Sequence, residues 1–598
     1  MIKIIKHLFK LLTPIQRKGF YALQALAIIM ALTQVVGVAS IVPFMALVGD
    51  MNQLQEDTIF AQAYKASGIT SESQFIFWLG VGVLVMLFIS SVISMITTWR
   101  LSLFANKVGV ELADRLYTHY LKQDWLFHAS GSSAQLTKKI ATESLRVTSG
   151  ILLPLVHMNG NIILVIFMAL SIFIFDPIVA IIGVIIFAIS YYFVFSIVSF
   201  TLLRNGRSIS EMYEERFRLM NEGFGGIKDV LLLGRHTDFI NRFYKTGQTF
   251  AFTSGVNAAL AHAPRYFMEW IAFGSMIALV LYLFSSHDGN VSLILPILSV
   301  YAIAGIKLLP AFQQIYNSLA NIEANIAAFE SIEEDLNDSI KAKLVTKKLE
   351  QGYLSPKKQV SLENVTFTYP DKHEPVLNQL NISIPVNKVI GIVGPSGSGK
   401  STLVDILLGL IEIKKGCLKI DGTIIDRANR RLWQNTIGFV AQAIFLSEGT
   451  IAENIAFGIP NNQIDHKKVK KALKLANLEE FVQALKLGVD TKVGERGVQL
   501  SGGQRQRIGI ARALYNEAEV LFFDEATSSL DGITEKMIME AVHEFSGKKT
   551  IVMIAHRLKT VEKCDQIFFI DEGKVADQGT FDELIERNEK FRNMANHA

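Results

Sequence analysis

Long apolar runs without charged residues dominate the first half of the chain. No Asp, Glu, Lys or Arg occurs from Phe20 to Gly49, a stretch longer than the roughly 20 residues that a helix needs to cross a bilayer. Similar runs follow at about 75–99, 152–175, 177–199, 262–285 and 291–313. Residues 1–330 are therefore predicted to form an all-α transmembrane domain with six membrane-spanning helices, the first at about 20–49.

After about residue 330 the pattern changes to short β-branched strands that alternate with helical segments. This alternation is typical of an α/β domain. Residues 358–598 are predicted to form that domain, and the charged stretch 331–357 is predicted to be the linker. The fold class is thus that of a multi-domain membrane protein.

Basic residues are concentrated in two of the predicted connections. Residues 100–150 and 200–262 are rich in Lys and Arg, whereas 50–74 holds only Lys65 among four acidic residues. By the positive-inside rule, both termini and the two long connections are expected in the cytoplasm. Each long connection exceeds 45 residues, so we expect the spanning helices to continue well into the cytoplasm. Residues 50–72 are expected to form either a short external helix or an irregular loop.

Composition excludes several classes of protein. Half of the 598 residues are hydrophobic and the mean hydropathy is +0.32, too apolar for an ordinary soluble protein of this length. The two cysteines, Cys417 and Cys564, lie far apart, which argues against a disulfide framework and agrees with a reducing compartment. A cleavable signal peptide is not expected, because the first apolar run is too long. Six predicted spans also exclude a soluble protein that acts on nucleic acid.

The second domain contains a phosphate-binding motif, GPSGSGKS, from Gly394 to Ser401. It fits the pattern G-x-x-x-x-G-K-[ST], follows the strand pattern KVIGIVG and precedes the helical segment STLVDILLGL. Its glycines let backbone N–H groups surround phosphates, while Lys400 is placed to reach the outer phosphates and Ser401 to hold Mg²⁺. The nucleotide-binding residues predicted here are Gly394, Pro395, Ser396, Gly397, Ser398, Gly399, Lys400, Ser401 and Thr402.

Two carboxylates end a later apolar strand pattern, VLFFDE. Asp524 is predicted to bind Mg²⁺, and Glu525 to act as general base or to position the attacking water. Between the two motifs, LSGGQRQR places glycines at the start of a second helix, a further phosphate-binding helix N-terminus. The residues of this second site are Ser501, Gly502, Gly503 and Gln504. Two such helix N-termini in one domain suggest that two chains share each nucleotide.

These motifs together resemble those of ATP-binding cassette (ABC) domains. With the predicted spans before them, they make nearly the whole chain similar to a half-size ABC exporter. The resemblance implies ATP and Mg²⁺ as cofactors, a homodimer in a bacterial inner membrane, and ATP hydrolysis coupled to transport. It also implies that Tyr369 stacks on adenine, that Gln442 senses Mg²⁺ and that His556 contacts the γ-phosphate.

Two of the predicted spans carry charged side chains. In 262–285 the only Lys, Arg, Asp or Glu residues are Arg265 and Glu269, and Lys307 lies at a similar depth in the sixth span. Charge inside a membrane is costly and marks a functional site by default. Three interpretations stay open: a structural ion cluster, a basic site for an anionic substrate, and a proton-linked role. Arginine favours a phosphate-bearing ligand, because its planar fork matches phosphate.

A resemblance in the membrane segments narrows the choice among these three interpretations. The segments APRYFMEWIAFGSMIALVLYL, SIVPFMALVGD and VYAIAGIKLLPAFQQI are similar to bacterial lipid-linked oligosaccharide flippases of the protein-glycosylation type. That family moves a polyprenyl-pyrophosphate glycan through a cavity with basic residues, so Arg265, Glu269 and Lys307 would lie on the substrate path. A further arginine of that family has no match here, where Ile89–Ser91 are apolar or small. Export of another lipid, a peptide or a drug, and an ATP-gated regulatory or channel subunit without transport, stay as alternatives.

Overall fold

The computed structural model describes the chain except for residues 1, 50–53, 55–58, 176, 287–290, 346–351, 371, 495–496, 526–546, 556 and 597–598. The chain divides into two compact units. The first comprises Met1–Gln123 and Phe127–Val345, and the second comprises Asp124–Leu126 and Thr346–Ala598. Each unit is described by itself below.

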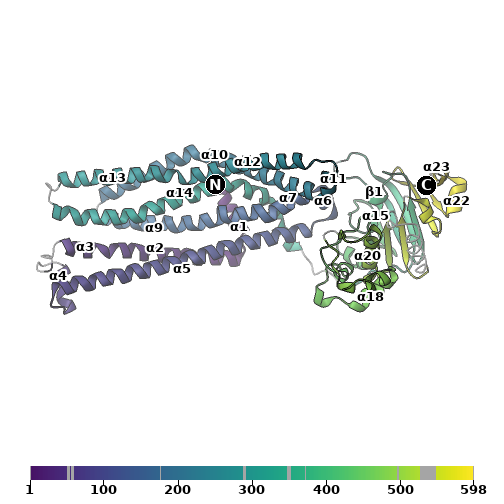
Figure 1. Cartoon of the computed structure of the whole chain (residues 1–598), viewed down its shortest axis with the longest axis horizontal. Helices are drawn as coiled ribbons and strands as arrows, with labels where there is room; N and C mark the ends of the chain where they lie inside the picture. Colours follow the sequence, from purple (N-terminus) through teal and green to yellow (C-terminus); the bar gives the residue numbers. More distant parts are fainter. Residues whose placement is uncertain are drawn as a thin grey trace. The chain divides into compact units, whose positions relative to one another are not determined.

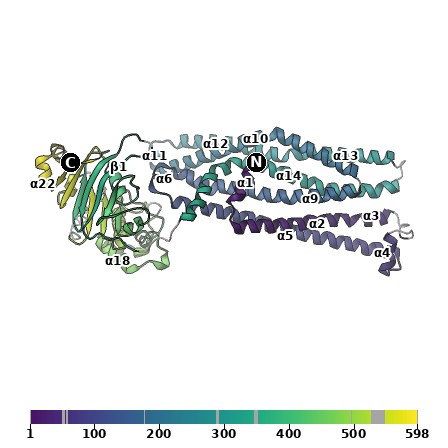
Figure 2. The same ribbon diagram turned by 180° about the vertical axis from the view of Figure 1, so that it is seen from behind.

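The first unit is helical throughout its described residues. Its helices are α1 (Ile2–Leu11), α2 (Pro14–Ala39), α3 (Ile41–Gly49), α4 (Ile59–Ser67), α5 (Glu72–Leu121), α7 (Ser133–Lys138), α8 (Ser144–Val147), α9 (Leu153–Phe175), α10 (Pro177–Gly225), α11 (Ile227–Leu232), α12 (His236–His262), α13 (Pro264–Ser286) and α14 (Val291–Val345). Helix α6 (Trp125–Ser130) begins in the segment that belongs to the second unit. Figures 1 and 2 show that α9, α10, α12, α13 and α14 run side by side, and that α2 runs along α5.

Five helical segments of the described residues are long and apolar enough to cross a membrane. They are Pro14–Val48, Glu72–Leu121, Ser133–Ile174, Pro177–Gly225 and His236–Ser285. Two of these segments have 50 residues, which is about 75 Å at 1.5 Å per residue, far longer than a bilayer core. The prediction that spanning helices continue beyond the membrane is thereby confirmed. The sixth predicted span, 291–313, lies within α14 and stays a prediction.

A buried ionic network ties these helices together beyond the apolar core. Glu143 is fully buried, and its carboxylate pairs with Arg146 at 3.0 Å and with Lys138 at 3.8 Å. Arg146 Nη1 also donates to Ser210 Oγ of α10 at 2.6 Å, and its Nε donates to Asn325 Oδ1 of α14 at 3.1 Å. π-Helical turns at Lys139–Glu143 and Thr148–Leu152 flank α8, so the helix that carries Arg146 is irregular on both sides of it.

The second unit is an α/β domain with two sheets. A four-stranded antiparallel sheet has the order β2-β1-β4-β5, and a six-stranded, mainly parallel sheet has the order β10-β9-β3-β8-β7-β6. The strands are β1 (Gln359–Phe367), β2 (Leu377–Pro385), β3 (Val389–Val393), β4 (Lys415–Ile420), β5 (Thr423–Ile424), β6 (Ile437–Val440), β7 (Val520–Asp524), β8 (Thr550–Ile554), β9 (Gln566–Asp571) and β10 (Lys574–Gly579). The helices are α15 (Lys400–Leu407), α16 (Arg430–Gln434), α17 (Ile451–Ile455), α18 (His466–Leu475), α19 (Glu479–Gln483), α20 (Gly502–Tyr515), α22 (Phe581–Arg587) and α23 (Glu589–Asn596). Strands β3, β7 and β8 are almost continuously apolar and buried, as expected of parallel strands covered on both faces.

The structure adds detail at two predicted segments, the linker 331–357 and the connection 50–72. Helix α14 continues to Val345, through the first part of the predicted linker 331–357, and the unit boundary follows directly after it. The alternative of an external helix within 50–72 corresponds to α4 (Ile59–Ser67), while most of 50–58 lies outside the described residues.

Candidate nucleotide site and membrane-embedded charges

The GPSGSGKS motif forms the loop between β3 and α15. Gly397 and Gly399 have φ angles of 83° and 99°, in the left-handed region that favours glycine. A Cβ atom on Gly394 would lie 2.0 Å from the carbonyl oxygen of Ile570, and one on Gly399 would lie 2.9 Å from the carbonyl oxygen of Val376. The glycines of the motif are therefore required by backbone conformation and by close approach of neighbouring backbone.

Lys400 lies inside this loop at the first position of α15. Its Nζ donates to the carbonyl oxygens of Gly394 and Pro395, both at 2.8 Å. Burial lowers the pKa of Lys400, while the nearby carboxylates of Asp524 and Glu525 favour its charged form. The loop thus holds a buried ammonium with two carboxylates in its electrostatic neighbourhood.

The residues of the loop fit a phosphate group. Ser398 Oγ is buried and has no hydrogen-bond partner among the described residues, so a polar atom is available inside the loop. Helix α15 begins at Lys400, and the first N–H groups of a helix lack partners within the helix. An anion at this helix N-terminus is favoured by the helix dipole and by the Lys400 charge.

The two predicted catalytic carboxylates lie at the end of β7. Asp524 is the last residue of β7, in register with Ile554 of β8. Glu525 follows with φ of 47°, an uncommon conformation for a residue with a side chain, and its N–H donates to the Ile554 carbonyl at 3.0 Å. Gln442 Nε2 donates to Glu525 Oε2 at 2.6 Å. The structure therefore joins Glu525 to Gln442 and places both carboxylates close enough to Lys400 to affect its charge.

Tyr369 contacts the same helix from a different strand. It follows β1 and is half-buried, with its hydroxyl 3.1 Å from Thr402 Oγ1 of α15. Its ring packs edge-on against Phe367 at a centroid distance of 5.0 Å. The tyrosine is thus held beside the phosphate-binding loop. His556, the other residue assigned by resemblance, lies outside the described residues.

The Ser501–Gln504 segment begins α20 with a reciprocal cap. Ser501 Oγ accepts from the Gln504 N–H at 3.2 Å, and Gln504 Oε1 accepts from the Ser501 N–H at 2.9 Å. Within the described part of the chain, no hydrogen bond or ion pair joins this segment to residues 394–402. One chain therefore presents the two predicted phosphate-binding segments separately.

One contact of the second unit was missed by sequence reasoning. Trp125, in the short segment grouped with this unit, donates its Nε1–H to Asp405 Oδ2 of α15 at 3.2 Å. The neighbouring Asp124 accepts from Arg430 at 3.1 Å. Burial raises the pKa of Asp405 to about 6, against the Trp125 hydrogen bond, which favours the carboxylate. The signal in the sequence that could have indicated this contact was a tryptophan next to an aspartate within the basic connection 100–150.

Arg265 and Glu269 form an ion pair along α13. Arg265 Nε donates to Glu269 Oε1 at 2.7 Å, the spacing of neighbours on one helix face. The Arg265 side chain is 60% exposed in the chain and that of Glu269 is 29% exposed. Lys307 of α14 is exposed, and among the described residues no ion pair or hydrogen bond joins it to either of them. The structure therefore brings two of the three predicted substrate residues together.

Each of the two units matches a known protein family. Residues 38–304 match the ABC transporter transmembrane region, and residues 377–528 match the ABC transporter family of ATP-binding domains. The second match includes the Gly394–Thr402 loop, Ser501–Gln504 and the carboxylates at the end of β7. Together the two matches cover most of the chain.

Similar proteins and a solved structure have the same extent as this chain. The ATP-dependent lipid A-core flippase of Sodalis glossinidius (strain morsitans) is 28% identical over 548 residues, covering 86% of this chain and 88% of the relative. The flippase of the same name from Escherichia coli (strain K12) is 28% identical over 527 residues, covering 85% and 86%. A bacterial Atm1-family ABC exporter with ATP bound shares the fold, with a TM-score of 0.77 and 21% identity over 98% of this chain and 99% of that one. The chain is therefore a half-size ABC exporter, a multi-pass membrane protein in which ATP hydrolysis by one cassette is coupled to transport.

Proposed function

We propose that this exporter flips a polyprenyl-pyrophosphate-linked oligosaccharide across a bacterial inner membrane. Two identical chains form the working unit, with their termini and cassettes in the cytoplasm. The observation that carries the substrate proposal is the Arg265–Glu269 pair, which lies in an apolar helix of a predicted span. A charged pair at such a position is costly and needs a role.

Within each cassette, the chain's own residues bind and orient the nucleotide. Lys400 binds the outer phosphates, and Tyr369 stacks on the adenine from its position beside Thr402. Ser401, Gln442 and Asp524 provide oxygen ligands of the kind that Mg²⁺ prefers. Bound ATP with Mg²⁺ supplies the phosphoanhydride bond whose hydrolysis drives the cycle.

Glu525 carries the proton chemistry of hydrolysis. Its carboxylate is held by Gln442 at 2.6 Å, and its backbone is held by the hydrogen bond to β8. A carboxylate held in this way can orient a water molecule and accept its proton. His556 contacts the γ-phosphate by resemblance to the family.

Two chains are needed to complete each nucleotide site. The reciprocal cap of Ser501 and Gln504 orders the first turn of α20, so that N–H groups of Gly502 and Gly503 can meet a phosphate held by the other chain. Nucleotide held between two cassettes favours their closed arrangement, because only that arrangement offers both sets of contacts. ATP binding and hydrolysis would thus alternate the two states of the membrane helices.

In the membrane half, Arg265 would recognise the pyrophosphate. A guanidinium can bind two phosphate oxygens at once, and its weak hydration makes it suited to a site of low water content. Glu269 holds Arg265 in place until the anion competes for it, and the exposed Lys307 adds positive charge on α14. The lipid A-core flippases support a lipid substrate, because those relatives move an amphipathic lipid.

The test is ATP-dependent flipping of a fluorescent polyprenyl-pyrophosphate oligosaccharide in proteoliposomes. Arg265→Ala is compared with a charge exchange, Arg265→Glu together with Glu269→Arg, which keeps an i,i+4 ion pair and moves the guanidinium by one turn. If Arg265 binds pyrophosphate, both variants lose flipping. If the pair is only structural, the charge exchange restores flipping, and this result refutes the substrate role.

Two further outcomes distinguish the alternatives. If the same preparation flips lipid A-core but not the oligosaccharide lipid, the substrate is another lipid. ATP hydrolysis that no lipid stimulates, with no transport of any lipid, would indicate a regulatory or channel subunit.

A further inference from the structure

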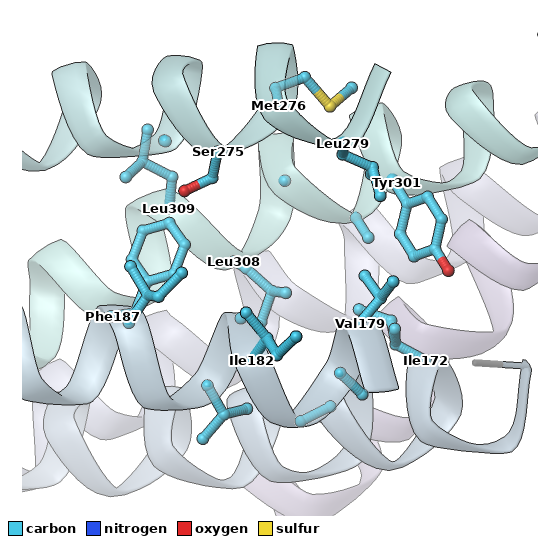
Figure 3. A pocket seen from close by; sticks show the side chains of 18 of the residues that line it. Ile172, Val179, Ile182, Phe187, Ser275, Met276, Leu279, Tyr301, Leu308 and Leu309 are labelled. Carbon is cyan, nitrogen blue, oxygen red and sulfur yellow. The ribbon is translucent and has the colours of Figure 1, made fainter. Parts of the chain in front are cut away.

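Four helices of the membrane half line a partly open apolar cavity. Its volume is about 890 Å³, and it is lined by residues of α9, α10, α13 and α14. Figure 3 shows side chains that include Phe187, Leu279 and Leu309 facing one open space. Ile172 and Val179 line it close to the place where α9 ends and α10 begins, so it lies toward the end of the bundle with the short connections.

Three of the residues that line this cavity are glycines. Gly183, Gly274 and Gly305 line the cavity from α10, α13 and α14. A Cβ atom on any of them would meet nothing within 4 Å. Glycine in a helix interior costs about 1 kcal/mol relative to alanine, so three of them around one cavity need a reason. Close backbone contact between helices is the usual reason in membranes, and the open space at each position argues against it here.

The lining specifies the chemistry of an occupant. Nearly all of it is aliphatic or aromatic, and Ser275 and Tyr301 are the labelled lining residues that carry a hydroxyl in Figure 3. Apolar side chains of this kind favour contact with an apolar ligand. A volume within the usual range of ligand pockets, in helices apolar enough to span a membrane, suits a hydrocarbon chain.

Polar groups lie next to the cavity along the same helices. Ala272 is the lining residue of α13 closest in sequence to the ion pair; Glu269 precedes it by about 4.5 Å of helix rise and Arg265 by about 10.5 Å. On α10, the ring of Tyr191 stacks on that of the lining residue Phe312, with a centroid distance of 6.0 Å. The Tyr191 hydroxyl is buried, has no hydrogen-bond partner among the described residues, and lies within electrostatic reach of Glu269.

We infer that this cavity binds the hydrocarbon chain of the transported lipid while Arg265 holds the phosphate end. The inference rests on the proposed function and adds a chain-binding site to it. An apolar cavity on the same helix as an exposed arginine, about 10.5 Å of helix rise away, matches a lipid with a long hydrocarbon chain and an anionic head.

The test is photolabelling of the full-length protein in proteoliposomes without ATP. The probes are a polyprenyl monophosphate and a phosphatidylcholine, each with a diazirine in its hydrocarbon chain, and labelled peptides are identified by mass spectrometry. The polyprenyl probe is expected to label α10, α13 and α14 at lining residues, at least tenfold more than phosphatidylcholine does. Gly274→Leu and Gly305→Leu fill the space and should each reduce this labelling about tenfold. Gly82→Leu on α5 is the matched control, because its Cβ also meets nothing within 4 Å but lies outside the cavity.

Three results would overturn the inference. Equal labelling by both probes means that bilayer lipid fills the cavity. Labelling that survives both leucine substitutions, in protein that elutes as wild type on size-exclusion chromatography, means that the chain binds elsewhere. In the third result, no lining residue is labelled, and cysteines introduced at the cavity form a disulfide between two copies of the chain. This result means that the second chain fills the cavity. Because labelling needs no ATP turnover, a failure to flip the oligosaccharide lipid refutes the proposed function separately.

Discussion

Replacing Gly394 by alanine tests whether the phosphate-binding loop depends on the close approach of β9. The added Cβ would lie 2.0 Å from the Ile570 carbonyl oxygen, whereas ordinary contacts begin at 3.4 Å. One of the two backbones must therefore move by about 1.4 Å, the difference between these distances. Neither moves freely, because Val393 of β3 is paired in register with Phe569 of β9.

The loss of stability expected for Gly394→Ala follows from these contacts. Overpacking of this kind costs about 1–3 kcal/mol, and loss of one ladder hydrogen bond adds about 1 kcal/mol. At roughly 2–4 °C per kcal/mol for a domain of this size, the cassette transition should fall by about 5–15 °C. Scanning calorimetry of the purified full-length protein without nucleotide measures this shift. A fluorescent ATP analogue should also bind more weakly, because the loop is displaced.

The matched variant is Gly397→Ala in the same loop. Its φ is 83°, but its Cβ would meet nothing within 4 Å, so only conformational strain of about 1–2 kcal/mol is expected. Gly394→Ala should therefore lower the transition temperature more than Gly397→Ala does. Equal or smaller destabilisation by Gly394→Ala, with wild-type ATP affinity, would refute the reasoning.

Three other changes should have distinct effects. Glu525→Gln should reduce ATP hydrolysis by about 10²–10⁴-fold while nucleotide binding persists, measured by phosphate release and equilibrium binding; a rate above a tenth of wild type contradicts the role of general base. The raised pKa of Asp405 disfavours its charged form in the folded state, so stability present below the ordinary value of 3.8 is lost as pH rises through about 6. Asp405→Asn should therefore raise the transition temperature at pH 7.5 more than at pH 5, by a few degrees at most because the group is partly exposed. Glu143→Ala should destabilise the membrane half by about 3–5 kcal/mol, since it leaves Arg146 buried without its carboxylate; a change below 1 kcal/mol in unfolding assays would show that the pair contributes little.

Sequence patterns predicted the parts of this fold that depend on interactions between residues close together in the chain. Apolar runs longer than a bilayer predicted the long helices, and the spacing in GPSGSGKS predicted a turn that only glycines allow, as the φ angles at Gly397 and Gly399 show. The charged stretch 331–357 was predicted to be the linker, and α14 continues through its first part to Val345. The described residues 331–345 are helical, and hydropathy alone does not distinguish such a charged helix from a loop.

Contacts between distant segments could not be predicted in the same way. The Gln442–Glu525 hydrogen bond joins residues 83 positions apart, and Trp125 meets Asp405 across 280 positions. The ionic network of Glu143 depends on three helices, and no single segment indicates it. The cavity between α9, α10, α13 and α14 likewise follows from how far apart the helices pack, since each glycine alone is compatible with close contact.

The most direct test of the account is the initial rate at which wild type and Glu525→Gln flip a fluorescent polyprenyl-pyrophosphate oligosaccharide in proteoliposomes with ATP and Mg²⁺. The account predicts ATP-dependent flipping by wild type that Glu525→Gln loses together with hydrolysis. A wild type that hydrolyses ATP but does not flip this lipid would contradict the proposed substrate. Flipping that persists in Glu525→Gln would contradict the coupling of hydrolysis to transport.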